Sequence, residues 1–244
     1  MVPPGVLGMT KGFRMRIVVF GANGPTGHLL TRRALDEGHE VTAFTRHPLD
    51  FPIADEALTV AGGDVGDETS VRDAIRGQHV VLSALGGVYT RKPVSVYSVG
   101  ARSILTAMQE HGVRRLAVVS SSATVPNPNA NESFFFGRML QPFVRNVLGR
   151  TLYADMARME ALVAASDTDW TIVRPSGLFD ADERSDYDVS AEPLPGRFTS
   201  RIDLADLLLR QAYDDAFSKS PASIITRTGV PSVAQLMMKE AFGK

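Results

Sequence analysis

Three glycines at regular spacing follow a short apolar run near the start of the chain, in the segment GANGPTG at residues 21–27. The run Ile17–Phe20 reads as a β-strand, and the residues after Gly27 have the apolar period of a helix. Backbone N–H groups at the start of a helix bind anions, and a diphosphate can approach them closely only where side chains are absent. A strand, a glycine-rich turn and a helix in this order therefore predict a site for the diphosphate of a dinucleotide.

Each glycine of this turn has an expected task. Gly21 permits the tight turn, Gly24 lets backbone and phosphate come close, and Gly27 lets the helix lie against the first strand. The spacing differs by one position from the usual Gly-x-Gly-x-x-Gly, and no lysine follows it, which disfavours a nucleoside triphosphatase loop. A purely structural turn is the alternative. The residues predicted to bind the dinucleotide here are Gly21, Asn23, Gly24, Pro25, Thr26 and Gly27.

The residues after the second expected strand bear on the choice between NAD and NADP. Sites for NAD usually place Asp or Glu about 20 residues beyond the glycines, where it bonds the ribose 2′-hydroxyl. Here that place holds Thr45, Arg46 and His47, so the acid is missing and a guanidinium is present. A planar cation suits a 2′-phosphate. Thr45 and Arg46 therefore predict that NADP(H) is preferred over NAD(H), unless Arg46 is only a solvated loop residue.

Along the rest of the chain, short β-branched runs alternate with segments of helical period, which is typical of a mostly parallel sheet. The expected strands are Arg16–Phe20, Glu40–Thr45, Leu58–Ala61, His79–Ala84, Arg115–Ser120, Trp170–Arg174 and Ser223–Thr226. The expected helices are Thr26–Glu37, Ser70–Arg76, Val94–Glu110, Thr151–Ala165, Arg201–Tyr213 and Pro231–Ala241. Gly38, Gly77 and Gly112 fall just past helix ends, where glycine commonly forms the C-terminal cap.

This alternation predicts one α/β domain over residues 15–244, a Rossmann-like, doubly wound parallel sheet with strand order 3-2-1-4-5-6 and a seventh strand. Residues from about 175 to 244 are expected to contribute a small lobe on the substrate side. Residues 1–14 are expected to be a flexible extension, because prolines and glycines are frequent there.

Two stretches break the alternation. The segment Pro126–Arg150 is expected to be a loop followed by an inserted helix, Phe134–Val147, which is either a core-packing excursion or a substrate lid. The segment Phe179–Arg197 is rich in Asp and Glu but lacks the glycine and glutamate order of a calcium-binding loop. It is therefore predicted to be a solvated acidic loop, and no metal site is expected.

The composition excludes several classes of protein. The 244 residues carry 26 Lys and Arg against 27 Asp and Glu, a net charge of −1, whereas nucleic-acid binding needs a surplus of cations. There is no cysteine, which excludes disulfides and thiolate chemistry. No apolar run approaches the ~18 residues of a membrane span. We therefore expect a cytoplasmic protein that does not cross a membrane and whose partner is a small molecule.

Taken with these residues, the chain resembles the atypical short-chain dehydrogenase/reductase superfamily, particularly its NmrA-like and biliverdin-reductase-B-like NAD(P)-binding members. The matching segments, spread over most of residues 15–210, are GANGPTG at 21–27, FTR at 44–46, GDV at 63–65, SALGG at 83–87, SSSATVP at 120–126 and MEALVAASDTDWTIVRPSGL at 159–178. The resemblance implies that Asp64 and Val65 border the adenine and that Pro175 and Ser176 lie by the nicotinamide. The further cofactor contacts that it implies are Ala84, Leu85, Gly86, Ser120 and Ser121.

The chain departs from this superfamily at the proton relay. Orthodox members use a serine with a Tyr-x-x-x-Lys pair on the following helix, where the lysine lets the phenol pass a proton. Tyr153 is followed four positions later by Ala157. Aligning Glu160 with the glutamate that often follows the lysine instead puts Leu152 and Met156 in the two places. In either alignment the lysine is missing.

Two residues are candidates for catalysis. Ser122 resembles the substrate-facing serine of the superfamily and would hydrogen-bond an acceptor, although a role in a cap or turn fits its position equally well. Tyr153 can donate a hydrogen bond, but a phenol without a neighbouring cation is a poor base.

Cofactor-binding residues without a proton relay predict two functions. The first is an NADPH-dependent reductase that transfers hydride to a small conjugated acceptor, such as a flavin, quinone or tetrapyrrole, which can take its proton from water. The alternative is a non-catalytic, NmrA-like redox sensor that binds NADP(H) and acts through a protein partner, for which Phe134–Phe136 offer an apolar docking surface. A sugar-nucleotide epimerase, suggested by SSSATV at 120–125, needs the missing relay and is less favoured.

Overall fold

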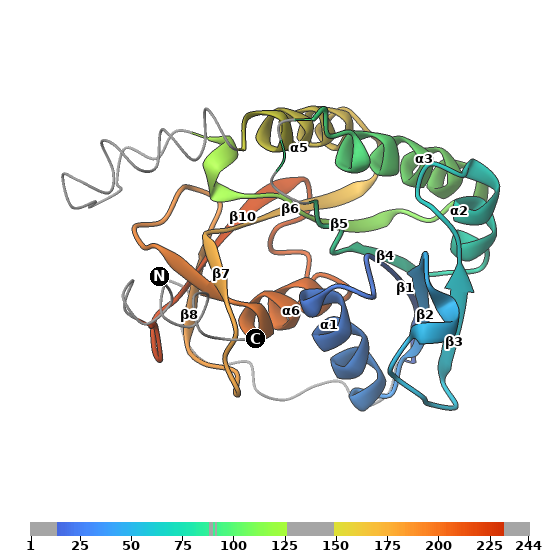
Figure 1. The fold of residues 1–244 in the computed structure, drawn as a ribbon, viewed down its shortest axis with the longest axis horizontal. Coiled ribbons are helices and arrows are strands. Elements are labelled where there is room, and N and C mark those ends of the chain that lie inside the picture. Colours follow the sequence, from blue (N-terminus) through green and yellow to red (C-terminus); the bar gives the residue numbers. More distant parts are fainter. Residues whose placement is uncertain (1–13, 88–89, 91, 126–148, 232–244) are drawn as a thin grey trace.

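Eight strands form one sheet in the computed structural model, which describes residues 14–87, 90, 92–125 and 149–231 (Figure 1). The strands are β1 Arg16–Phe20, β2 Glu40–Thr45, β3 Leu58–Gly62, β4 Val80–Ser83, β5 Arg115–Val119, β6 Asp169–Pro175, β8 Tyr187–Ser190 and β10 Ser220–Thr226. Their order across the sheet is β3-β2-β1-β4-β5-β6-β10-β8. All neighbours pair in parallel except β8, which is antiparallel to β10. The predicted order 3-2-1-4-5-6 and the predicted seventh strand are confirmed.

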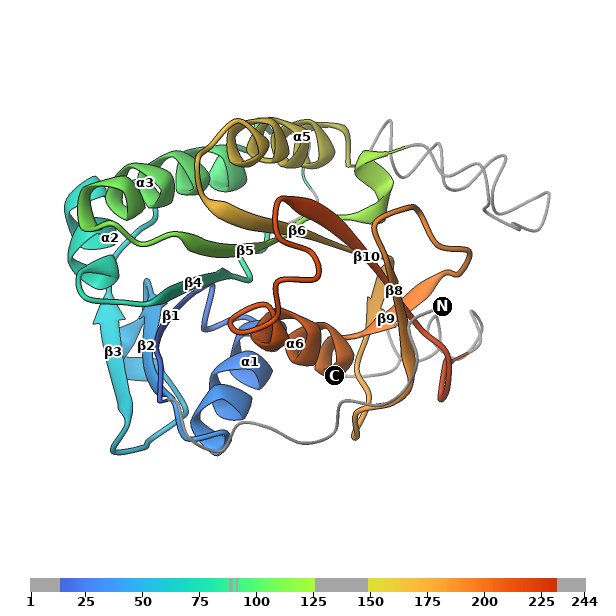
Figure 2. The ribbon, with the colours of Figure 1, turned by 180° about the vertical axis from the view of Figure 1, so that it is seen from behind.

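Helices cover both faces of this sheet (Figures 1 and 2). They are α1 Pro25–Asp36, α2 Glu68–Ile75, α3 Val96–His111, α5 Arg150–Ala164 and α6 Arg201–Arg210, with the short 3₁₀ helices η1 Pro48–Asp50 and η2 Ser122–Thr124. α1 and α6 lie side by side on one face, and α2, α3 and α5 lie on the other. This arrangement is that of a doubly wound α/β fold.

The two faces of β1 enter two separate hydrophobic cores. Ile17 and Val19 pack with residues of α1 and α6, whereas Val18 and Phe20 pack with residues of α2 and α3. All four side chains are fully buried. A strand at the centre of a parallel sheet has helices on both faces, so its residues form a continuous apolar run. This is why the sequence predicts both ends of β1.

The acidic stretch Phe179–Arg197 is not only a loop. It contains β8. The strand β7, Gly177–Phe179, ends where this stretch begins, and β9, Phe198–Ser200, begins just after it; β7 and β9 form a separate two-stranded sheet. The Tyr187 hydroxyl of β8 donates to the fully buried carboxylate of Asp206 on α6. Burial and this carboxylate raise the pKa of Tyr187, so the phenol keeps its proton and remains the donor. The prediction of a solvated loop is therefore wrong for β8, because partners far along the chain stabilise this strand.

The helix predicted over Arg201–Tyr213 ends three residues early, at Arg210. Beyond it, the guanidinium of Arg115 on β5 donates to the carbonyl oxygens of Gln211 and Asp214. Basic side chains can hydrogen-bond the carbonyl groups at a helix C-terminus. Arg115 therefore ties the segment that follows α6 to the sheet, a contact that the sequence of the helix does not show.

Three predictions fall wholly or mainly outside the residues that the structure describes, namely the extension 1–14, the inserted helix Phe134–Val147 and the helix Pro231–Ala241. Within the described ranges, no group of three or more His, Asp and Glu side chains is placed to hold a metal ion. No helix of that part of the chain is long and apolar enough to span a bilayer.

Candidate cofactor and catalytic site

The carboxyl ends of the parallel strands meet at one edge of the sheet, and most of the predicted site residues follow these ends. The chain leaves β1 at Gly21, β4 at Ala84, β5 at Ser120 and β6 at Ser176. β1 and β4 are neighbours although β2 and β3 lie between them in the sequence, so the strand order reverses at this point. Ligands of doubly wound sheets bind in the crevice at such a switch point.

The glycine-rich turn packs against the end of β4. The Gly24 N–H donates to the Gly21 carbonyl over 3.1 Å, which closes the turn. Gly21 has a φ of +74°, and a Cβ there would lie 2.5 Å from the Ala84 carbonyl oxygen. A Cβ at Gly27 would overlap the Gly21 carbonyl oxygen. The turn itself therefore requires these two glycines, because a side chain at either position would clash with backbone atoms.

Gly24 differs from them, because the fold does not require a glycine there. Its φ of −80° suits any residue, and a Cβ would meet only the Gly21 carbonyl oxygen, at an ordinary 3.4 Å. Gly24 is the N-cap of α1, yet no side chain of the described residues caps this helix end, and its first turn contains no acid. The N–H groups at this end are thus left open to an anion. The turn fits the diphosphate of a dinucleotide.

The other predicted residues of the turn leave this helix end uncharged. Pro25 occupies the first helical position, where an N–H would have no partner within the helix. Asn23 is exposed, and its Oδ1 lies 3.1 Å from His28 Nε2, while Thr26 is buried. Burial lowers the pKa of His28, so the imidazole is neutral at physiological pH. The start of α1 therefore presents backbone donors without a competing side-chain charge.

The residues predicted to hold the adenosine half lie together after β2 and β3. The Thr45 carbonyl accepts from the Gly63 N–H over 3.0 Å, which joins the ends of these two strands. Arg46 follows Thr45 and is exposed. The Asp64 carboxylate accepts a backbone N–H two residues on, over 2.9 Å, and Val65 is buried. An exposed guanidinium thus stands beside a polar turn at this end of the site.

The three predicted residues after β4 lie between the two halves of the site. The Ala84 N–H donates to the Phe20 carbonyl over 2.9 Å and holds this segment against β1. Leu85 is half-buried and packs on the core beneath α3. Among the described residues, no atom lies within 4 Å of a Cβ built at Gly86, so this glycine leaves open space at the crevice.

A buried carboxylate of α5 positions the segment that follows β4. Asp155 is fully buried and accepts from the Tyr97 N–H over 2.9 Å and from the Ser98 hydroxyl over 2.5 Å. Tyr97 and Ser98 are in the first turn of α3, and the side chain of its N-cap residue, Ser95, makes no capping bond to this turn. The Tyr97 hydroxyl in turn accepts from the Gly87 N–H over 2.8 Å. Asp155 therefore caps α3 from another helix and steadies the loop beside the crevice.

The three consecutive serines after β5 make different contacts. Ser120 donates to Glu160 Oε1 over 2.5 Å, and Ser121 caps η2 by accepting a backbone N–H over 3.2 Å. Ser122 Oγ instead lies 3.2 Å from Ser176 Oγ, just past the end of β6. Ser122 and Ser176 thus form a pair of half-buried hydroxyls at the end of the site predicted for the nicotinamide.

Glu160 and Arg174 support this hydroxyl pair, although the sequence predicts no role for them. The Glu160 carboxylate accepts from Arg174 Nη2 over 2.6 Å and from Thr124 Oγ1 over 2.9 Å, besides Ser120. One carboxylate therefore joins α5, β6 and the loop after β5. Both charged side chains are largely buried, at 12% and 15% exposure. Glu160 is on a helix and Arg174 is on a strand. The helical and strand periods of the sequence relate residues within one element, so they do not predict that these two side chains meet.

Tyr153 lies on α5, which contains no lysine. Its ring is half-buried and packs on the core that α3 and α5 share. The neighbouring Leu152 is buried, and its Cδ1 would lie 2.8 Å from a Cβ at Gly87. Met156 is buried as well. Apolar side chains therefore occupy both positions of the alternative alignment, and α5 has no lysine to activate a phenol.

A family model for NAD(P)H-binding proteins matches residues 21–215. A curated relative, the sterol demethylase protein B of Methylococcus capsulatus, is 30% identical over 173 residues, which cover 67% of this chain and 52% of that protein. The chain thus spans about half the length of this relative and less of other curated relatives that it matches, down to 12%.

Solved structures with the same fold include a short-chain dehydrogenase/reductase from Veillonella parvula in complex with NADP. Its TM-score is 0.71 at 18% identity, with 89% of this chain and 96% of that chain covered. An anaerobillin reductase from Escherichia coli O157:H7 has a TM-score of 0.66 at 22% identity, with 89% and 100% covered. At these identities the likeness is one of fold.

Proposed function

Because the chain belongs to the NAD(P)H-binding family, we propose that it is a reductase that uses NADP(H) in preference to NAD(H) and transfers hydride to a small conjugated acceptor of the flavin, quinone or tetrapyrrole type. One observation carries this proposal: an open helix start and a hydroxyl pair lie at one edge of the sheet, while α5 lacks the lysine of a proton relay. The neighbour in complex with NADP and the anaerobillin reductase support it. The proposal includes a cytoplasmic location and an acceptor-side lobe from about residues 175–244.

The cofactor would be held from the glycine turn to the ends of β5 and β6. Gly24 and the first turn of α1 receive the diphosphate, and Arg46 binds the 2′-phosphate that distinguishes NADP from NAD. The remaining proposed contacts, from the adenine to the nicotinamide, are Thr45, Asp64, Val65, Ala84, Leu85, Gly86, Ser120, Ser121, Pro175 and Ser176. Bound NADPH supplies a hydride at the nicotinamide end.

The side chains at that end assist by hydrogen bonding rather than by proton transfer. Ser122 and Ser176 each have a hydroxyl that can donate to an oxygen or nitrogen atom of the acceptor. Glu160 holds the loop that carries Ser122, and Tyr153 would add a further donor. Because α5 lacks the lysine of the proton relay, the acceptor would be one that takes its proton from water.

Stopped-flow oxidation of NADPH with a panel of flavins, quinones and tetrapyrroles tests the reductase. We expect rates well above those of the enzyme-free mixture for at least one acceptor, and Ser122→Ala to lower the turnover number by about tenfold or more. If NADPH binds but its oxidation is no faster than in the enzyme-free mixture, the NmrA-like sensor that acts through a protein partner becomes the better candidate. The segment Phe134–Phe136 that would dock such a partner lies outside the described part of the chain.

Arg46→Ala is expected to weaken the binding of NADPH by about 10- to 100-fold, because a charge-assisted hydrogen bond to the 2′-phosphate is lost. Binding of NADH should change by less than about threefold, since NADH has no such phosphate. Calorimetric titration with both dinucleotides measures the difference. Arg32→Ala, which removes an exposed arginine of α1, is the control. An equal loss for both dinucleotides, or no loss, would contradict the 2′-phosphate assignment.

A further inference from the structure

The chain leaves the sheet at Ser176, directly after β6. Pro175, the last residue of β6, pairs with Ile224 of β10, and the next strand, β7, belongs to the separate sheet with β9. The Ser176 N–H donates to a side chain of β9, the hydroxyl of Thr199, over 3.1 Å. Ser176 is also the residue whose own hydroxyl lies beside Ser122. A threonine hydroxyl therefore holds the backbone of one member of the hydroxyl pair.

Thr199 is fully buried, and its hydroxyl makes two hydrogen bonds. The oxygen accepts from the Ser176 N–H, and the hydrogen is donated to the Ile224 carbonyl over 2.7 Å. Since a hydroxyl has one hydrogen, the bond to Ile224 leaves a lone pair for Ser176. A buried N–H or carbonyl without a partner costs free energy, so both bonds hold the hydroxyl in place. Thr199 thus joins the end of β6 to β10 through β9.

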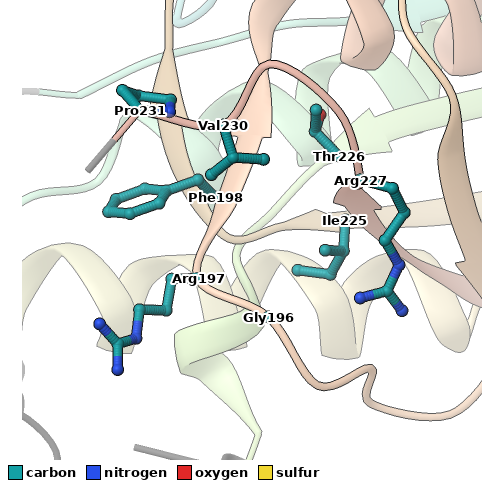
Figure 3. Close-up of a pocket in the computed structure, with 8 residues that line it drawn as sticks. All are labelled: Gly196, Arg197, Phe198, Ile225, Thr226, Arg227, Val230 and Pro231. Carbon is teal, nitrogen blue, oxygen red and sulfur yellow. The ribbon is translucent and has the colours of Figure 1, made fainter. Parts of the chain in front are cut away.

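The strand that carries Thr199 is itself held by hydrogen bonds to β10 and α6. Figure 3 shows a pocket between the start of β9, at Phe198, and the end of β10, at Thr226, and its volume is about 460 Å³. Beside this pocket, the Ser200 N–H donates to Thr226 Oγ1 over 2.8 Å. Thr226 Oγ1 in turn donates to the carboxylate of Asp203 on α6, over 2.6 Å. Hydrogen bonds therefore fix β9 where side chains leave a gap.

The Asp203 carboxylate is the centre of this network. It is fully buried, and besides Thr226 it accepts from the N–H and the hydroxyl of Ser185, each over 2.8 Å. The Asp203 N–H donates to the Ser200 hydroxyl over 3.1 Å. A buried carboxylate is stable only when its oxygens have hydrogen-bond donors, so these contacts resist displacement. The network joins α6, β9, β10 and the segment before β8, and it fixes the position of Thr199 relative to them.

We propose that Thr199 is a positioning residue of the candidate site. By holding the Ser176 backbone, it keeps the Ser176 hydroxyl against Ser122 and beside the nicotinamide. The two hydroxyl oxygens lie 3.2 Å apart, which is longer than the ~2.8 Å usual for such a pair, so a small shift of Ser176 would separate them. This inference rests on the proposed reductase function, in which Ser176 contacts the nicotinamide of the cofactor.

Two ligands that differ in the nicotinamide test this role. 2′-Phospho-ADP-ribose has the parts of NADPH other than the nicotinamide, so the ratio of the two dissociation constants measures what the nicotinamide contributes to binding. Calorimetry gives both constants. We expect Thr199→Val, which keeps the shape of the side chain but removes the hydroxyl, to lower this contribution about fivefold by weakening NADPH alone. Thr199→Ser keeps the hydroxyl and should restore the original ratio.

Ser176→Ala separates positioning from stability. This variant removes the Ser176 hydroxyl but keeps the N–H that bonds Thr199, and it should also lower the nicotinamide contribution about fivefold. In the Ser176→Ala background, Thr199→Val should lower the contribution no further, because the hydroxyl that it positions is already gone. The loss of unfolding free energy caused by Thr199→Val, measured in urea, should be the same in both backgrounds.

Thr171→Val is the matched control. Thr171 is a fully buried threonine near the start of β6, and its hydroxyl accepts from Arg115 over 3.1 Å and donates to the Phe217 carbonyl over 2.8 Å. Its loss should destabilise the fold and leave the nicotinamide contribution unchanged. If Thr199→Val does not fold, Thr199→Cys takes its place, because a thiol is a weaker acceptor than a hydroxyl.

Three results would overturn the role of Thr199. They are equal binding of NADPH and 2′-phospho-ADP-ribose by the unmodified protein, an unchanged ratio in Thr199→Val, and the same loss of the ratio in both backgrounds. Normal NADPH binding together with any of these contradicts this inference and leaves the cofactor site standing. Failure of the unmodified protein to bind NADPH contradicts the proposed reductase and, with it, this inference.

Discussion

The variant Gly24→Asp is expected to keep its fold and to lose binding of NADP(H). A Cβ at Gly24 meets one atom, at 3.4 Å, and the residue's φ of −80° is open to aspartate. An N-cap aspartate accepts N–H groups of the first helical turn, so the free energy of unfolding should stay within about 0.5 kcal/mol of its original value or rise. The same carboxylate would occupy those donors and repel a diphosphate. Calorimetry should show the dissociation constant for NADPH raised roughly 100-fold or more.

Two companion variants separate capping, charge and packing. Gly24→Ser caps the helix without a charge and should weaken binding less than Gly24→Asp. Gly27→Ala should instead lower the free energy of unfolding by about 1–3 kcal/mol, because its Cβ would overlap the Gly21 carbonyl oxygen. If Gly24→Asp binds NADPH as well as the unmodified protein does, the glycine turn is a structural turn and the dinucleotide site lies elsewhere.

Asp155→Ala is expected to lower the free energy of unfolding by about 2–4 kcal/mol. The Tyr97 N–H and the Ser98 hydroxyl would lose their acceptor in buried surroundings, and the first turn of α3 would lose its cap. Because the Tyr97 hydroxyl accepts from the Gly87 N–H, the loop after β4 should loosen and NADPH should bind more weakly. Urea unfolding and an NADPH titration measure the two effects.

Two further carboxylate variants test whether the expected loss of stability in Asp155→Ala arises because Asp155 is a buried hydrogen-bond acceptor. Asp155→Asn keeps an acceptor oxygen at the same place and should lose less stability than Asp155→Ala. Asp73→Ala removes one side of an exposed ion pair with Arg76 and should change the free energy of unfolding by less than about 0.5 kcal/mol. A loss for Asp155→Ala as small as that for Asp73→Ala would mean that water, not α5, satisfies the start of α3.

Much of the site follows from patterns that are local in the chain. The ends of β1 and β2 match the predicted Arg16–Phe20 and Glu40–Thr45, because strands covered on both faces have mostly apolar sequences. The glycine turn follows β1 directly in the chain, so the sequence of this short segment is enough to predict its role. Once the strands are parallel, their carboxyl ends share one edge, which is why residues following β1, β4 and β5 converge.

The edge of the sheet is harder to predict from the sequence. β8, Tyr187–Ser190, is half polar, and within the described part of the chain it pairs with one strand, β10, whose residues come much later in the sequence. Its stabilising partner Asp206 is a charged residue of α6 that is fully buried, although charged residues usually mark a solvated face. Composition therefore suggests a solvated loop where the fold forms a strand.

The dinucleotide turn, the parallel strand order and the grouping of site residues can be derived from the sequence, because they depend on neighbours in the chain and on geometry common to all parallel sheets. The Asp155 cap and the Glu160 and Arg174 pair emerge only after folding. These contacts join residues 58 and 14 positions apart, on different elements. A hydrogen bond requires its atoms to lie within about 3 Å, and no pattern of residue types places two elements relative to each other that closely.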